Sequence, residues 1–102
     1  GFFKEMILLY FKTSENGLKT LEKAVAENDM ETISETAHKM AAPSKHLKAD
    51  ELYRKLKLLE NAPENQLDAN RITELFSDVK KEASEAIDYL KWFLNRWEAE
   101  QN

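Results

Sequence analysis

His38 is the residue of this sequence whose neighbours would best allow it to do chemistry. On a helix that turns roughly 100° per residue, with His38 at zero, the apolar side chains around it fall between about 200° and 280°. These core-facing side chains are Met30, Ile33, Ala37 and Met40. The imidazole lies about 80° outside that arc. We therefore predict that it faces water from the open side of its helix.

The side chains within about 60° of His38 are charged, hydroxyl-bearing or small. They are Glu31, Ser34, Glu35, Ala41 and Ala42. A neutral imidazole can act as a nucleophile and hold a covalent group when one ring nitrogen is free to attack. A phosphoryl group suits this setting because its transfer needs mainly in-line positioning and charge neutralisation. Lys39 and Lys45 are candidate cations, although both also fit the pattern of ordinary solvated lysines.

Other kinds of site are less well supported by the same segment. An exposed histidine is most often a solvated side chain, and His46, which follows Pro43, is interpreted as a surface or capping residue. The two histidines lack the Glu-x-x-His pairs, repeated on several helices, that bind metals in helical bundles. We predict no metal site and no cofactor. The sequence also contains no Gly-rich phosphate loop or catalytic triad, so a conventional enzyme is not expected.

Composition limits the fold and the partners. The 102 residues include only two Gly, two Pro and no Cys, which favours one all-helical domain in a reducing compartment such as the cytoplasm. The net charge of -4, from 19 acidic and 15 basic side chains, argues against nucleic acid. Apolar runs such as residues 6–11 are far shorter than the roughly 20 residues that span a membrane. Neither nucleic acid nor direct membrane contact is therefore expected.

Hydrophobic periodicity predicts four helices, at about residues 3–27, 29–46, 50–61 and 67–99. The first is expected to continue through its weak helix formers at 13–17. Asn28-Asp29 is a capping pair for the start of the second helix, and Asn28 and Glu31 have the spacing of a capping box. Pro43 should end or bend that helix. The clearest loop is 61–65.

Two long and two short helices predict an antiparallel four-helix bundle over residues 1–102, with the long helices projecting at one end. Ser14 and Gly17 lie on the buried stripe of the first helix, where small side chains let another helix pack closely. Aromatic and apolar residues from the two ends of the chain should form part of the core. These are Phe2, Phe3, Ile7, Trp92, Phe93 and Trp97.

The segment around His38 resembles the signature of histidine phosphotransfer (HPt) domains, which runs roughly His-x-Leu-Lys-Gly-x-Ser, then Leu-Gly-Ala, then a Leu three residues on. The matching residues are Ala37-His38-Lys39-Met40-Ala41-Ala42-Pro43-Ser44, then Leu47-Lys48-Ala49 and Leu52. The first helix, which ends in Leu-x-x-Ala-x-x-x-Asn-Asp, is also similar to that family. The resemblance covers about half of the chain, and the remainder matches only in its helical period.

The resemblance implies a four-helix phosphocarrier. His38 would accept a phosphoryl group from the aspartate of one receiver domain and pass it to another. Mg²⁺ would belong to the receiver, and the carrier would be a cytoplasmic monomer without catalytic activity of its own. Because such domains often end a hybrid sensor kinase, which can be anchored in a membrane, and because the chain starts without Met, we expect neighbouring domains upstream.

The sequence departs from the family at several positions. Ala41 stands where a lysine is common, so Lys39 or Lys45 would have to neutralise the phosphoryl charge. Ala42 replaces the usual glycine, and Pro43 and Lys48 are also unusual. Ser44 keeps the small polar position, but the wheel turns it toward the core, so only a supporting role is expected.

These departures leave two other classes of function open. One is a helical interaction module that carries no phosphate. The other is a homo-oligomeric scaffold built on the fourth helix.

Overall fold

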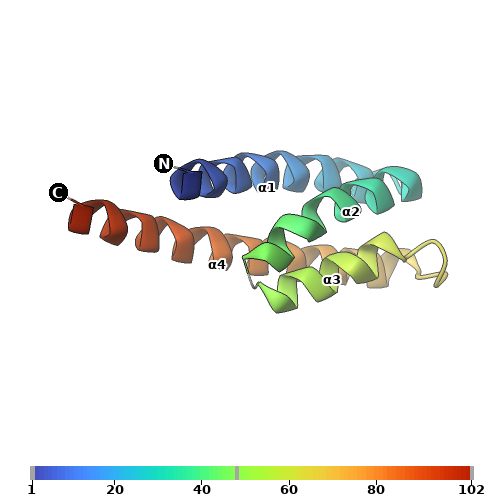
Figure 1. Cartoon of the computed structure of the whole chain (residues 1–102). Helices are drawn as coiled ribbons and strands as arrows, with labels where there is room; N and C mark the ends of the chain where they lie inside the picture. The colour runs from blue at the N-terminus through green and yellow to red at the C-terminus, as the bar shows by residue number, and fades with distance from the viewer. Residues whose placement is uncertain (1, 48, 102) are drawn as a thin grey trace.

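The computed structural model describes residues 2–47 and 49–101, and these residues form four helices (Figure 1). The helices are α1 (Phe2–Ala26), α2 (Met30–His46), α3 (Asp50–Glu60) and α4 (Ala69–Gln101). No strand occurs in the described residues, so the all-helical prediction is confirmed. Every helix end lies within two residues of its predicted position, which is the usual uncertainty of such boundaries. α1 is continuous, as predicted.

The four helices pack compactly at one end of an elongated molecule. α2 lies against α1 and α3, and α4 also lies against α1 and α3. The molecule measures 51 × 19 × 17 Å, and the free ends of α1 and α4 extend together beyond α2 and α3 (Figure 1). There Lys4 Nζ lies 3.3 Å from Glu98 Oε2, so the start of α1 is beside the end of α4. Projection of the long helices is therefore confirmed.

The core lies where α2 and α3 cover the long helices. Its buried side chains come from all four helices and include Leu21, Ile33, Leu56, Leu59, Leu75 and Val79. A Cβ atom built on Gly17 would lie only 2.5 Å from Met40 Sδ. The predicted close approach of another helix at the small residues of α1 is therefore confirmed, and the approaching helix is α2.

The start of α2 is capped by Asp29 and not by Asn28. The Asp29 carboxylate accepts hydrogen bonds from the Thr32 backbone N–H at 3.2 Å and from the Thr32 hydroxyl at 2.7 Å. These bonds, the hydroxyl bond first, hold the pKa of Asp29 below its usual value. Asn28 instead has a positive φ of 54°, a conformation that Asn tolerates after a helix end. Of the predicted capping pair, Asp29 is therefore confirmed as the cap, and the capping box of Asn28 and Glu31 is wrong.

α4 begins later than predicted for a similar reason. Asp68 accepts a hydrogen bond from the Arg71 backbone N–H at 2.8 Å, which fixes the helix start after position 68. The loop predicted at 61–65 is confirmed and extends as turns to Gln66, which also has a positive φ. Ala62 is fully buried in this loop and joins the core.

Pro43 lies inside α2, which continues to His46. The proline ring removes one backbone donor, the one that would bond to the carbonyl of Lys39. The next turn nevertheless keeps its helical hydrogen bond, because the Leu47 N–H donates to the Pro43 carbonyl at 3.2 Å. Of the two expectations for Pro43, an end or a bend, the structure excludes the end, and the helix runs to His46 as predicted. Lys48, which follows, lies outside the described residues.

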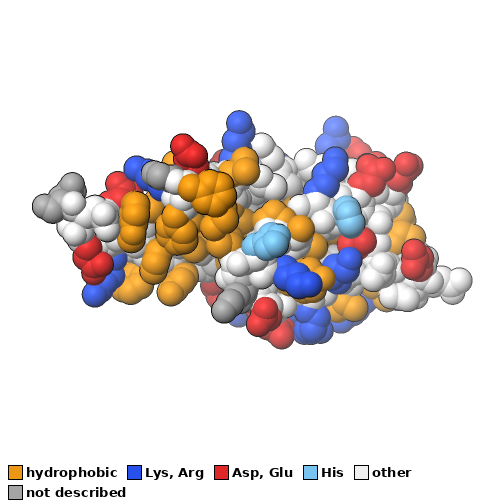
Figure 2. Space-filling model, in the orientation of Figure 1, with side chains coloured by type: hydrophobic (Ala, Val, Ile, Leu, Met, Phe, Trp, Pro, Cys, Tyr) orange, Lys and Arg blue, Asp and Glu red, His pale blue; other side chains and the backbone are white. Residues whose placement is uncertain are grey.

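The aromatic residues of the projecting end form pairs, but they are not all core. The centre of the Phe3 ring lies 5.8 Å from the centre of the Phe93 ring and 6.1 Å from that of the Trp97 ring. Trp92 remains 54% exposed and Phe2 82% exposed, because α2 and α3 do not reach this end. Hydrophobic side chains consequently gather over it in Figure 2. The prediction of an aromatic and apolar core is confirmed for the contacts of Phe3 with Phe93 and Trp97 and for Ile7, which is fully buried. It is wrong for the burial of Phe2, Phe3 and Trp92, which are exposed.

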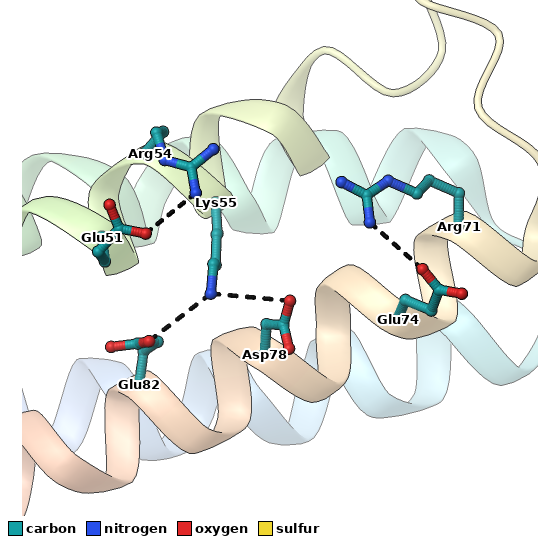
Figure 3. A network of polar contacts seen from close by, with 7 residues as sticks. All are labelled: Glu51, Arg54, Lys55, Arg71, Glu74, Asp78 and Glu82. Carbon is teal, nitrogen blue, oxygen red and sulfur yellow. Dashed lines mark hydrogen bonds and ion pairs between the residues drawn. The ribbon is translucent and has the colours of Figure 1, made fainter.

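An ion-pair cluster joins α3 to α4. Lys55 Nζ lies 3.7 Å from Asp78 and 3.6 Å from Glu82 (Figure 3). Positions 57 and 60 lie about 140° to 200° around the helix from position 55. Docking of Lys55 on α4 therefore turns Lys57 and Glu60 toward the opposite side of α3.

In the described parts of the chain, no helix combines the length and the apolar character needed to cross a membrane.

Candidate functional site

His38 lies on the outer side of α2, and its side chain is 70% exposed. The predicted exposure is confirmed. Both histidines of the chain are visible on the face shown in Figure 2. An incoming protein can therefore reach the His38 ring without any rearrangement of the helices.

The face around His38 agrees with the helical wheel except at one position. The predicted core side holds Ile33, Ala37 and Met40 buried, with Met30 half-buried. On the His38 side, Glu31, Glu35 and Ala42 are exposed and Ser34 is half-buried. Ala41, expected on this open side, is instead buried in the core. The expectation for Ala41 is wrong because α2 packs against both α1 and α3, which widens its buried arc beyond the apolar stripe.

The other supporting residues have different environments. Lys39, next to His38, is exposed. Lys45 is exposed too, but its ammonium lies 5.6 Å from the centre of the Tyr53 ring of α3. Ser44 is buried, and its hydroxyl donates to the Met40 carbonyl at 3.0 Å. The Ser44 hydroxyl is therefore occupied inside α2, and Lys39 is an exposed cation adjacent to His38 in the sequence.

Sequence analysis missed Glu60, the last residue of α3. His38 Nδ1 lies 3.1 Å from Glu60 Oε2, and Lys57 Nζ donates to Glu60 Oε1 at 2.9 Å. The bond from Lys57, and to a lesser degree that from His38, holds the pKa of Glu60 below its usual value against the opposing effect of partial burial. The carboxylate is therefore ionised at neutral pH. Nothing in the periodicity of the chain connects position 60 with position 38, and only the i, i+3 spacing of Lys57 and Glu60 was visible.

The hydrogen-bond roles follow from the charge of Glu60. An ionised carboxylate has no proton to give and can only accept, so His38 Nδ1 must be the donor. Among the described residues, no hydrogen bond is made to the other ring nitrogen, Nε2. A neutral His38 ring with its proton on Nδ1 therefore presents the lone pair of Nε2 to solvent.

A second contact fixes the end of α3 against α2. The Ser34 hydroxyl, one turn before His38, donates to the backbone carbonyl of Glu60 at 2.7 Å. The neighbouring Leu59 and Ala62 are fully buried. The Glu60 backbone is thus fixed against α2, and the bonds to Lys57 and His38 orient its carboxylate.

A shallow apolar pocket of about 190 Å³ lies between α1 and the end of α2. It is lined by Met6, Leu9, Tyr10, Thr13, Pro43, His46 and Leu47. His46 is thus an exposed residue at the edge of an apolar surface, as its interpretation as a surface residue predicts. Across the described residues, no three or more His, Cys, Asp or Glu side chains are grouped closely enough to hold a metal ion.

No protein family, characterised protein or solved structure matches this chain. The chemistry of the His38 site therefore has to carry the functional conclusion.

Proposed function

We propose that this domain is a phosphocarrier of the HPt type, in which His38 accepts a phosphoryl group from a receiver-domain aspartate and passes it to a second receiver. The observation that supports this proposal best is the exposed His38 imidazole on a helix face without large apolar side chains. A receiver must bring its aspartyl phosphate to within bonding distance of the ring, so an open face is the first requirement of the reaction.

The transfer needs one bond to form and one to break. Nε2 of His38 attacks the phosphorus in line, and the phosphorus–oxygen bond to the aspartate breaks. The aspartate leaves with the electron pair as a carboxylate, and the phosphoryl group is held on His38 as a phosphoramidate. The reverse sequence delivers it to the next receiver. The chain itself supplies no cofactor to this step, since the Mg²⁺ belongs to the receiver, and Lys39 is the proposed counter-charge.

The setting of the carrier is part of the same proposal. We assign the four helices to an antiparallel four-helix bundle, supported by the packing of each helix on two others and by the Lys4–Glu98 pair. We assign the domain to the cytoplasm, as a monomer that acts beside receiver and kinase domains. The face of α2 around His38 would be covered by each receiver in turn.

Phosphorylation of purified domain tests the proposal. The wild type is incubated with a phosphorylated receiver, and in parallel with phosphoramidate, a small phosphoryl donor. We expect a label that is stable to base and labile to acid, and we expect its complete loss in His38→Gln. His46→Gln, which changes the other exposed histidine of the same helix, should keep the label. Absence of label in the wild type, or its persistence in His38→Gln, would refute the proposal.

A second candidate is an interaction module that carries no phosphate. It is favoured by the exposed apolar side chains near the start of α1, such as Leu8 and Leu9, and by the adjoining pocket. This alternative predicts partner binding that is unchanged in His38→Gln, with no label from either donor.

A further inference from the structure

The projecting end, where hydrophobic side chains gather in Figure 2, carries a row of apolar residues along α1. Phe2, Met6, Leu9 and Thr13 follow one another at intervals of four, three and four residues. This is the spacing with which one helix packs along another in a coiled coil. Phe2 is 82%, Met6 36% and Leu9 63% exposed, and Thr13 is half-buried. We call these four residues the α1 seam. Within the described chain, the seam is not covered by the second helix that its spacing suits.

Two charged residues flank the α1 seam on one side. Glu5 directly precedes Met6, and Lys12 directly precedes Thr13. In a coiled coil, residues at this position form ion pairs across the interface and set the orientation of the helices. Glu5 and Lys12 are both exposed, and across the described residues neither forms an ion pair. Both charges are therefore available to a helix that lies along the seam.

We propose that two copies of this chain associate through the α1 seam, with their α1 helices antiparallel. In this register Met6 of one copy lies level with Leu9 of the other. Glu5 of each copy is then offset by two residues, or about 3 Å along the helix axis, from Lys12 of the other copy. Because the arrangement is two-fold symmetric, the pair of opposite charges occurs twice.

A parallel arrangement of the two helices would not use these charges. The charged flank of one α1 would then meet the other flank of its partner, which is formed by Phe3 and Tyr10. Tyr10 is buried, and the Phe3 ring contacts Phe93 of α4, so neither offers a charge. Glu5 and Lys12 lie on the same helix, seven residues apart and opposite in sign, which makes this flank complementary to an antiparallel copy of itself. A second copy of the chain is therefore the occupant that we assign.

The pocket at the end of α2 provides a second contact in the same register. The pocket has a volume of about 190 Å³, and Thr13, Pro43 and Leu47 are among its lining residues. Phe2 of the second copy lies level with Thr13, beside this pocket. An apolar cavity of about 150 Å³ can bind benzene, so the space is sufficient for one phenyl ring. The most exposed of the large hydrophobic side chains in the described residues would thus be buried once in each copy.

The association leaves the proposed phosphoryl site outside the overlap. The overlap covers residues 2–13 of α1, whereas α2 rests on α1 farther along, where Met40 meets Gly17. The two ends covered by α2 and α3 therefore lie at opposite ends of the antiparallel pair, and His38 of each copy stays accessible. The proposed transfer needs only one copy of the domain. Association is thus a concentration-dependent addition to the monomeric carrier, and it does not depend on phosphate.

Analytical ultracentrifugation of the purified domain at low salt measures the association. We expect the average mass of the wild type to rise toward twice the monomer mass between about 10 µM and about 1 mM, because so short an interface binds weakly. Leu9→Ala should weaken association at least about 10-fold, because this side chain lies at the centre of the overlap. Leu9 is mostly exposed in one copy, so the variant should fold, which circular dichroism verifies. A wild type that stays monomeric over this range would overturn the inference.

Charge reversal tests the orientation of the two helices. Glu5→Lys or Lys12→Glu alone places two like-charge pairs in the self-associated form and should weaken it at least about 10-fold. An equal mixture of the two variants restores both opposite-charge pairs, so the mixture should associate as tightly as the wild type. The control is Glu22→Lys, which makes the same change of charge at an exposed position of α1 outside the overlap and should leave association unchanged.

The remaining outcomes also decide the inference. Equal association in Glu5→Lys and Glu22→Lys, or a mixture that fails to recover the wild-type association, would overturn antiparallel pairing through the α1 seam. His38→Gln separates this inference from the proposed function, because it removes the proposed phosphoryl acceptor and should associate as the wild type does. Loss of association in His38→Gln would place the interface on α2 and refute the seam, whatever the result for phosphoryl transfer.

Discussion

The long helices α1 and α4 run through both ends of this molecule, but the two ends differ in how many helices pack together. At one end α1 and α4 are covered by α2 and α3, and the side chains between them are almost completely buried. At the other end α1 and α4 have only each other, and Phe2 and Trp92 remain 82% and 54% exposed. A pair of helices can form aromatic contacts, but it cannot enclose a core.

The same difference separates the proposed site from the rest of the molecule. His38 and Glu60 come from different helices, and their 3.1 Å contact requires a fixed distance between α2 and α3. That distance is maintained by buried side chains on both helices. The projecting end offers more apolar surface than the site end, yet its residues are suited to contact another apolar surface and not to orient a reacting group.

The largest expected effect comes from removing core under the site. Leu56 is fully buried, so Leu56→Ala should lower the free energy of unfolding by about 2–5 kcal/mol. Trp92→Ala, at the projecting end, should cost less, about 1–1.5 kcal/mol, because half of its surface already contacts water. Urea denaturation followed by circular dichroism measures both. Equal losses would show that the projecting end stabilises the fold as much as the covered end does.

A smaller effect is expected at the start of α2. Asp29→Ala removes the acceptor of both Thr32 hydrogen bonds and should destabilise the domain less than Leu56→Ala does. Because the pKa of Asp29 is lowered in the folded state, its contribution is complete above the usual aspartate value of about 3.9 and is lost as the pH falls through the lower folded value.

Thermal unfolding across a pH series tests this dependence. The difference in stability between wild type and Asp29→Ala should be constant from neutral pH down to about pH 5. It should become smaller in more acidic solution. Glu27→Ala, an exposed carboxylate close to the same helix start, serves as the control. A difference that grew as the pH fell would contradict the capping role of Asp29.

The smallest effect is expected for the ion pair between the chain ends. Lys4 and Glu98 are each about 40% exposed, so Lys4→Met should change the free energy of unfolding by at most about 1 kcal/mol. Salt should weaken whatever stabilisation the wild-type pair provides. The free energy of unfolding of the wild type and of Lys4→Met in 0.05 M and 1 M NaCl measures this stabilisation. If Lys4→Met lowered the free energy of unfolding as much as Leu56→Ala does, the projecting end would be held together by charge.

Periodicity was sufficient to predict features that one helix determines alone. The apolar stripe of α2 placed Ile33 and Met40 inside and His38 outside, and the helix ends followed from caps and loops within two residues. Features that depend on two helices could not be predicted in this way. Ala41 was misplaced because an alanine fits either face and only the position of α3 decides between them. Glu60 was missed because its partner is 22 positions away in the sequence.

Because Gly17 has no side chain, α2 can lie close to α1, and this close packing affects the distant contact between His38 and Glu60. α2 rests on α1 at this point through Met40, two residues beyond His38, with no room for even one additional carbon atom unless Met40 moves. A larger residue at 17 would therefore have to displace Met40 or raise α2 away from α1. Any lift of α2 would alter the separation between the His38 imidazole and the Glu60 carboxylate. A substitution on α1 would therefore weaken a contact that Gly17 itself does not touch.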